Sequence, residues 1–280
     1  MPSTALIFAF NSNFLRAFHA FLLSLRHSPA LYALDKVVIT TDPAIKLDSA
    51  VSESCRLIRL ISTDELTEFN SIILNEIDTR DRHAELPKYS MLKWFAFDDY
   101  GYERHIYLDV DMLNINSADG ILDCTHSDLC YCPKFVKDMK RIPPDGSFHP
   151  QEVVGRNLLS FCENYDCRRV LNSGVMVIGN RMLTPRVRKG LIEAASTQAF
   201  PSDQAVLRHW FLENKAFTEH LMSPLYNFSA DYLTRCDEET RNKLLDRIKF
   251  IHFIGKKPWS RPKSKLLWHD RFWLDNELAC

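Results

Sequence analysis

Two carboxylates follow a run of apolar residues in the segment HIYLDVDMLNIN, residues 105–116. Ile106, Tyr107 and Leu108 predict a buried strand, and Asp109 and Asp111 come directly after it with one valine between them. Because side chains alternate along a strand, both carboxylates are expected to project to the same side. Two like charges held together are costly unless a cation neutralises them. Oxygen ligands suit Mg²⁺ or Mn²⁺, so the pattern predicts a divalent-cation site.

The segments before this pair alternate between strand-like and helix-like patterns. Apolar runs predict strands at residues 3–10, 35–42, 55–61 and 104–111. Apolar periodicity predicts helices at residues 12–25, 63–77 and 87–100. Ser12 and Thr63 are the expected caps of the first two helices. The alternation predicts an α/β fold with a mostly parallel central sheet and helices on both faces. In such sheets ligands bind beyond the carboxyl ends of the strands, where Asp109 and Asp111 lie.

The composition limits the classes of protein to consider. The chain has 280 residues, enough for one large α/β domain or two small ones. Its 35 Lys and Arg balance 36 Asp and Glu, which gives no indication of nucleic-acid binding. The N-terminal segment lacks the basic start of a targeting signal, and no stretch approaches the roughly 20 apolar residues that span a bilayer. Eight cysteines without a Cys-x-x-Cys pair favour reduced thiols. We therefore expect a soluble, cytoplasmic protein.

Two segments in the second half carry polar residues inside or beside apolar patterns. The first, VLNSGVMVIGN at residues 170–180, predicts a strand in which Gly174 either allows close approach of the backbone to a ligand or marks a bulge. The second, FPSDQAVLRHWF at residues 200–211, predicts a helix that Ser202 or Asp203 caps. Read alone, each segment is compatible with a purely structural role.

A third segment, IKFIHFIGKKPW at residues 248–259, predicts a late strand that ends in His252. A single histidine at a strand end is usually structural. Here a glycine and two lysines follow it within five residues, at Gly255, Lys256 and Lys257. This combination favours a phosphate clamp. The two lysines repel each other when no ligand is bound, so the segment 252–259 has little to hold it and is expected to order when a phosphate ligand binds.

Seven motifs together resemble one known family. They are FAFNSNF, MLKW, YLDVDML, LNSGVMVIGN, SDQAVL, SPLYNF and IHFIGKKPW, in this order over about residues 4–260. The chain resembles glycosyltransferase family 8, whose members include glycogenins and bacterial lipooligosaccharide galactosyltransferases. The resemblance implies a GT-A fold, a UDP-sugar donor, a Mn²⁺ ion and transfer with retention at the anomeric carbon. It also implies one catalytic domain over residues 1–260, with a nucleotide-binding half (1–115), a sugar and acceptor half (116–260) and a tail (261–280).

The resemblance assigns roles to individual residues. It implies that Asp109, Asp111 and His252 bind the metal, and the imidazole suits Mn²⁺ better than the alternative Mg²⁺. Contacts to the nucleotide, diphosphate or sugar are implied for Phe8, Ala9, Phe10, Asn11, Phe14, Lys93, Val110, Asn172, Ser173, Gly255, and Lys256 or Lys257. Phe8 and Phe10 lie on an apolar strand and fit the core equally well. Asp203 and Gln204 are the catalytic candidates, since either oxygen could stabilise an oxocarbenium-like transition state. A covalent intermediate and front-face attack both remain open.

The C-terminal part of the chain is basic and aromatic. From Arg241 to Trp273 there are ten Lys and Arg against two acidic residues. The segment RPKSKLLWHDRFW, residues 261–273, fits contact with an anionic membrane surface or a lipid-linked acceptor, or else a helix that packs its aromatic rings on the core. The acceptor itself is left open as a carbohydrate, a lipid-linked molecule or a protein, with residues 133–151 as one expected wall.

The resemblance therefore implies a retaining transferase of glucose or galactose. One rival is a degenerate protein that binds nucleotide sugars without turnover. The other is a phosphatase-like phosphoryl transferase, in which an Asp-x-Asp pair would follow the first strand. Here three earlier strands precede the pair, which disfavours that rival.

Overall fold

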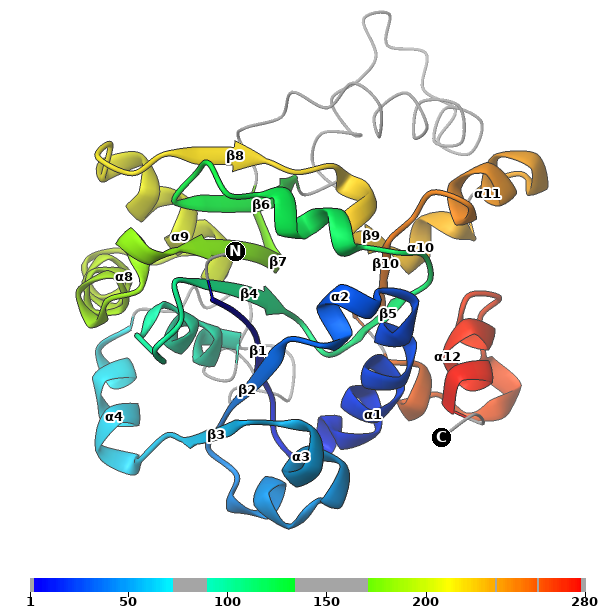
Figure 1. Ribbon diagram of the computed structural model, residues 1–280, viewed down its shortest axis with the longest axis horizontal. Coiled ribbons are helices and arrows are strands. Elements are labelled where there is room, and N and C mark those ends of the chain that lie inside the picture. The colour runs from blue at the N-terminus through cyan, green and yellow to red at the C-terminus, as the bar shows by residue number, and fades with distance from the viewer. Residues whose placement is uncertain (1–2, 73–89, 134–170, 235, 256, 278–280) are drawn as a thin grey trace, which may run out of the picture.

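The protein is built around one seven-stranded sheet. The computed structural model describes residues 3–72, 90–133, 171–234, 236–255 and 257–277. The strands lie in the order β3-β2-β1-β4-β7-β6-β8 (Figure 1). Their bounds are β1 Thr4–Ala9, β2 Asp35–Thr40, β3 Leu57–Leu60, β4 Arg104–Leu108, β6 Leu129–Pro133, β7 Leu171–Gly179 and β8 Glu219–Leu221. Only β7 runs antiparallel to its neighbours, so the expected mostly parallel sheet is confirmed.

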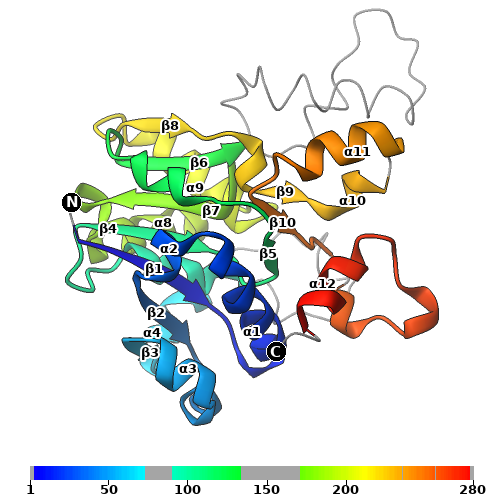
Figure 2. The same cartoon turned by 45° about the vertical axis from the view of Figure 1, so that its right-hand side comes forward.

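A second, three-stranded sheet lies beside the first (Figure 2). It consists of β5 (Met112–Asn114), β10 (Phe250–His252) and β9 (Phe228–Ser229), with β10 in the middle. Strand β10 runs antiparallel to β5, and His252 pairs with Met112. Because Met112 directly follows Asp111, this register carries His252 to the Asp-x-Asp segment from a distant part of the sequence.

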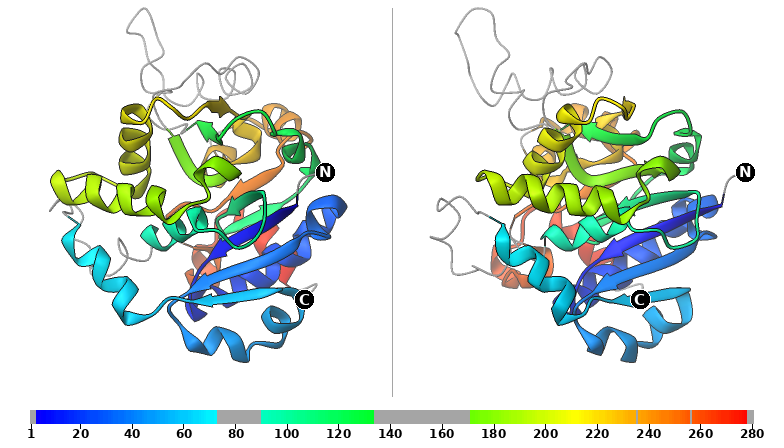
Figure 3. Two further views of the ribbon diagram at one scale, coloured as in Figure 1. Left: turned by 60° about the vertical axis from the view of Figure 1, so that its left-hand side comes forward. Right: turned by 90° about the vertical axis from the view of Figure 1, so that its left-hand side faces the viewer.

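Helices cover both faces of the large sheet (Figure 3). The α-helices of the described residues are α1 Leu15–Ser24, α2 Pro29–Tyr32, α3 Ser49–Ser54, α4 Thr63–Thr67, α8 Pro185–Thr197, α9 Asp203–Glu213, α10 Ala230–Leu233, α11 Glu238–Leu245 and α12 Asp270–Glu277. Alternate residues of β1 enter two separate cores. Leu6 and Phe8 pack on the side of α1, α12 and the small sheet. Ala5 and Ile7 pack on the side of α8, α9 and the 3₁₀ helix Leu92–Phe97. The two cores confirm the layered α/β architecture.

Both expected helix caps lie one residue from the observed ones. The side chain of Asn11, rather than that of Ser12, accepts a backbone N–H and opens a short 3₁₀ turn before α1 begins at Leu15. Ser62, rather than Thr63, caps α4 in a reciprocal capping box. In both cases the residue one position earlier is extended, and only there can a side chain turn back onto the free N–H groups of the first turn.

Two expected helices are shorter or tighter than their sequence patterns. Helix α4 ends at Thr67 and passes into a 3₁₀ helix, Glu68–Ser71. The helix expected at residues 87–100 is instead a 3₁₀ helix over Leu92–Phe97. All of its residues are buried. Because this segment is buried on all sides, it has no solvent-exposed polar face, and the pattern of apolar and polar residues is a poor guide to its helix type. Residues 73–77 and 87–89 of these predictions lie outside the described part of the chain.

Aromatic side chains of the C-terminal segment are packed inside. The indole of Trp273, on α12, is fully buried and contacts the rings of Phe253 and Trp259. Trp268 and Phe272 are partly buried against the same core. For these rings the structure shows the core-packing alternative. Among the described residues, no helix combines the length and apolarity that crossing a membrane requires.

Candidate active site

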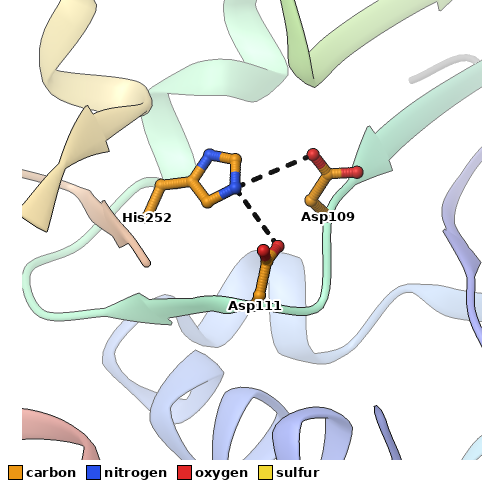
Figure 4. Close-up of side chains that lie close together, drawn as sticks. All are labelled: Asp109, Asp111 and His252. Atoms are coloured by element: carbon orange, nitrogen blue, oxygen red, sulfur yellow. Dashed lines mark ion pairs between the residues drawn. The ribbon is translucent and has the colours of Figure 1, made fainter. Parts of the chain in front are cut away.

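Three potential metal ligands converge at the junction of the two sheets. Asp109 follows β4, Asp111 precedes β5, and His252 ends β10 (Figure 4). One ligand atom from each lies within 4.8 Å of the others. The Nε2 atom of His252 is 3.2 Å from Oδ1 of Asp111 and 3.9 Å from Oδ2 of Asp109. Two carboxylates and an imidazole in this arrangement fit a divalent cation such as Mn²⁺.

Lys257 supplies a positive charge to this cluster from within the chain. Its ammonium group is ion-paired with Asp111 and also donates a hydrogen bond of 2.8 Å to the carbonyl of Phe253. Burial by itself would raise the pKa of Asp111, but the charges of Lys257 and His252 hold it well below the usual range. The ammonium group of Lys257 thus neutralises part of the negative charge of the two carboxylates.

These contacts correct the expectation that little holds the segment 252–259 in the absence of a donor. Lys257 has two partners in the protein itself, because the turn at Gly255 (φ 81°) brings the chain back toward Asp111. Gly255 is exposed, and a Cβ atom at this position would meet no other atom within 4 Å. Lys256, the other phosphate-binding candidate, lies outside the described residues.

Lys93 links the cluster to the residues expected around the sugar. Its Nζ atom lies 3.3 Å from Oδ1 of Asp109, 3.4 Å from Oδ2 of Asp203 and 3.1 Å from the hydroxyl oxygen of Ser173. Burial by itself would lower the pKa of Lys93, but Asp109 and Asp203 together raise it above the ordinary value. Lys93 is therefore a charged group whose position depends on both carboxylates.

Asp203 is turned into the site instead of capping its own helix. Its Oδ2 atom accepts a hydrogen bond of 2.8 Å from Ser173, and its side chain is buried. Ser202 holds the N-cap position of α9 but makes no side-chain capping bond. Gln204, the other catalytic candidate, has an Oε1 atom that is buried and has no partner among the described residues. Asp203 is thus the candidate that connects to Lys93.

Gly174 lies at a bulge and also allows close approach of the backbone to the ligand cluster, so both alternatives left open by the sequence apply. The pairing of β6 with β7 shifts here, since Tyr131 pairs with Met176 but Cys132 with Asn172, which leaves a bulge. A Cβ atom on Gly174 would lie 2.9 Å from Oδ2 of Asp109 and 3.0 Å from Cε1 of His252. The bulge therefore lets the backbone of β7 approach the ligand cluster closely. The Asn172 side chain is used locally, since its Oδ1 accepts the N–H of Gly174.

A cavity of about 200 Å³ lies next to the two aspartates. Its lining includes the expected residues Ala9, Phe10, Asn11, Phe14, Lys93, Asp109, Val110 and Asp111, together with Ser90, Leu92 and Tyr107. The structure thus brings the N-terminal strand end and the Asp-x-Asp segment to one cavity. Phe8 is a core residue, whose ring packs on Phe18 and Phe21. Phe10 lines the cavity but also stacks on Phe18.

Two residues that contact the ligand cluster were not predicted as site residues from the sequence. The hydroxyl of Tyr107 donates a hydrogen bond of 2.7 Å to Oδ1 of Asp109. Strand alternation could have identified it, because Tyr107 lies two residues before Asp109 and shares its side of the strand. The other is Asn227, whose Oδ1 lies 2.8 Å from Nδ1 of His252. The motif SPLYNF contains it, but no spacing in the sequence relates it to His252.

Comparison with known proteins identifies the fold. No family model and no curated protein matches this sequence. The apo structure of the bifunctional glycosyltransferase WbbM superimposes on 99% of this chain with a TM-score of 0.63 at 13% identity. The galactosyltransferase LgtC, in complex with donor and acceptor sugar analogs, superimposes on 98% with a TM-score of 0.62 at 15% identity. The glycosyltransferase GlyE of Streptococcus pneumoniae TIGR4 superimposes on 98% with a TM-score of 0.61 at 15% identity.

The chain therefore has the GT-A fold found in these glycosyltransferases. It spans 50% of the WbbM chain and 61% of the GlyE chain, but 95% of the LgtC chain. At these levels of identity the comparison establishes the fold, while the activity has to be argued from the site.

Proposed function

We propose that this protein is a metal-dependent, retaining glycosyltransferase of the family 8 type, which transfers glucose or galactose from a UDP-sugar to a carbohydrate acceptor. The observation that carries the proposal is the convergence of Asp109, Asp111 and His252 beside a cavity at the end of β4. In open α/β sheets this edge is where nucleotides bind. LgtC, which shares the fold, is described in complex with donor and acceptor sugar analogs.

Asp109, Asp111 and His252 would hold a Mn²⁺ ion, with Mg²⁺ as the alternative, and the ion would supply positive charge for the departing diphosphate. Lys257 would contribute a second positive charge. A cation held by Asp111 would compete with the ammonium group of Lys257 for that carboxylate, so Lys257 would then be free to bind a phosphate oxygen. Asn11 and Phe14, which line the same cavity as the two aspartates, would contact the nucleoside.

Asp203 would act on the sugar. A carboxylate beside the anomeric carbon stabilises the positive charge of an oxocarbenium-like transition state and can accept a hydrogen bond from a sugar hydroxyl. Lys93 and Ser173 hold Asp203 in place. Retention is compatible with a covalent intermediate on a side-chain oxygen and with front-face attack assisted by the leaving group.

The test is donor turnover. With Mn²⁺ and no acceptor, the purified protein is expected to release UDP slowly from UDP-glucose or UDP-galactose, and EDTA should stop the release. NMR of the first-formed product should show an α-anomeric coupling. A β-anomeric product would contradict the retaining assignment. Binding of the nucleotide sugar without any turnover would favour the degenerate binding protein, and hydrolysis of phosphomonoesters would favour the phosphoryl transferase.

Replacing Lys257 with Met should weaken UDP binding in the presence of Mn²⁺ by about tenfold to a hundredfold. This is the change in dissociation constant that corresponds to losing one hydrogen bond to a charged group. Mn²⁺ alone should bind at least as tightly as in the wild type, because the competing ammonium is gone. In EDTA the variant should melt at a lower temperature, because Asp111 is left buried without its partner. Calorimetry and thermal unfolding measure these effects.

The matched control for this prediction is Lys265→Met, since Lys265 is exposed in the same basic region. It should change none of the three quantities. Hydrogen exchange between Phe253 and Trp259 adds a direct measurement: protection should rise when UDP and Mn²⁺ are added together. Unchanged UDP affinity in Lys257→Met, or equal protection with and without ligands, would assign Lys257 a purely structural role.

A further inference from the structure

Asn227 lies behind the metal-ligand cluster, on the side of His252 away from the aspartates. It stands between the 3₁₀ helix Pro224–Tyr226 and β9, and its backbone N–H bonds to the carbonyl of Pro224. Its side chain is 1% exposed. Strand β9 runs parallel to β10 and pairs Ser229 with His252, which brings the Asn227 amide against the imidazole. Both residues are therefore fixed by the backbone of the small sheet.

The two nitrogens of His252 face different partners. Nδ1 is 2.8 Å from Oδ1 of Asn227, while Nε2 points toward Asp111 and Asp109. An amide oxygen can only accept a hydrogen bond. The hydrogen must therefore be on Nδ1 for this contact to form, and a neutral imidazole then has its lone pair on Nε2. That is the tautomer in which Nε2 can bind a cation.

The nitrogen of the Asn227 amide faces Gly174, in the bulge of β7. Its Nδ2 atom is buried and has no hydrogen-bond partner among the described residues. It lies 2.9 Å from the point where a Cβ atom of Gly174 would be. The bulge of β7 thus leaves room for this amide nitrogen in the same small space that accommodates Asp109 and His252. A side chain larger than glycine at position 174 would displace all three groups.

We infer that Asn227 is a positioning residue of the metal centre, which holds His252 in the tautomer and orientation needed for Nε2 to bind the cation. The inference rests on the proposed metal site and adds to it a residue that does not touch the metal. Histidine ligands commonly donate their second ring N–H to an oxygen acceptor, and loss of that acceptor weakens metal binding. Here the acceptor is a neutral amide, so it orients the ring without adding negative charge to a cluster that already contains two carboxylates.

The test compares two substitutions at position 227 by Mn²⁺ titration in the absence of nucleotide. Asn227→Leu keeps the approximate volume but removes the acceptor, and it should weaken Mn²⁺ binding by about tenfold to a hundredfold. Asn227→Asp keeps an oxygen acceptor and should restore most of the affinity. If Asn227→Leu binds Mn²⁺ as tightly as the wild type, or if Asn227→Asp is as weak as Asn227→Leu, the amide does not act as the acceptor and the inference is overturned.

Asn114→Leu is the matched structural control. Asn114, on β5, is equally buried, but its side chain bonds to Ser28 and to backbone carbonyls rather than to the cluster. This variant should lower the melting temperature in EDTA while leaving the Mn²⁺ dissociation constant unchanged. A similar loss of Mn²⁺ affinity in Asn114→Leu would show that general loosening of the small sheet, and not the contact with His252, weakens the site.

NMR of the wild-type protein decides the question if Asn227→Leu does not fold. With ¹⁵N-labelled histidine and Zn²⁺, which binds imidazole readily and is diamagnetic, in place of Mn²⁺, Nδ1 of His252 should carry the hydrogen. A hydrogen on Nε2 under these conditions would overturn the inference. The failure of the proposed function looks different: a wild-type protein that binds no Mn²⁺ would refute the metal centre, and the positioning role with it. Normal wild-type binding combined with an unaffected Asn227→Leu would refute the positioning role alone.

Discussion

Replacing Asp111 with Asn is expected to abolish Mn²⁺-dependent UDP binding and to lower turnover by roughly a hundredfold to a thousandfold or more, as when a group that stabilises transition-state charge is removed. Asp111 is the most buried carboxylate of the cluster and contacts both His252 and Lys257. Asparagine has nearly the same shape, so the fold should persist while one negative charge is lost. Calorimetry with UDP, with and without Mn²⁺, and a UDP-release assay measure the two effects.

The control for this variant is Asp99→Asn. Asp99 is exposed and accepts the backbone N–H of Gly101 through an oxygen that asparagine also has. It should leave UDP binding, turnover and melting temperature unchanged. The metal assignment would be wrong if Asp111→Asn bound UDP with the wild-type dependence on Mn²⁺. Loss of folding in Asp111→Asn alone would instead indicate that the pair with Lys257 is chiefly structural.

Replacing Asp203 with Asn is expected to lower kcat by about a hundredfold to a thousandfold, again the range for a lost electrostatic contact to the transition state. Binding of Mn²⁺ and UDP should hardly change, because Asp203 lies outside the cluster of Asp109, Asp111 and His252. Asparagine retains an oxygen that can accept the hydrogen bond from Ser173, so the geometry should survive. Steady-state kinetics and calorimetry on the same preparation separate the two effects.

Gln204→Ala is the comparison for this prediction, since both residues open helix α9 and both are catalytic candidates. The structure favours the larger effect at Asp203, which is held by Lys93 and Ser173, whereas Gln204 has an oxygen without a partner in the described part of the chain. A larger loss of kcat in Gln204→Ala would reverse the assignment. An equal loss of UDP affinity and kcat in Asp203→Asn would place its role in donor binding instead.

Much of the fold follows from local patterns in the sequence. Alternating apolar runs predicted the first four strands, and the composition allowed a core on each side of the sheet. Asp109 and Asp111 were expected on one side of a strand over residues 104–111. They do share one cluster, but β4 ends at Leu108 and both lie in the connection to β5. Helix ends were less well predicted, as Ser62 and Asn11 show, because a cap depends on which single residue leaves the helical conformation.

Some site residues could be identified from the sequence, but their contacts could not. Resemblance to a family could place His252 and Lys93 near the two aspartates. It could not show their other hydrogen-bond and ion-pair partners, because these come from distant segments of the chain. Sequence could not decide whether Phe8 faces the core or a ligand, since β1 is buried on both sides. Nor could it show that Lys257 pairs with Asp111.

By itself, the sequence determined the α/β class, the positions of the first four strands along the chain and the two carboxylates at a strand end, because these depend on periodicities of a few residues. Only the tertiary structure decided which nitrogen of His252 faces the carboxylates, that Asn227 stands behind it, and that Gly174 leaves room for both. Those contacts depend on the register of β10 against β5 and β9. A register joins segments far apart in the chain, and a shift of one residue would turn His252 to the opposite face.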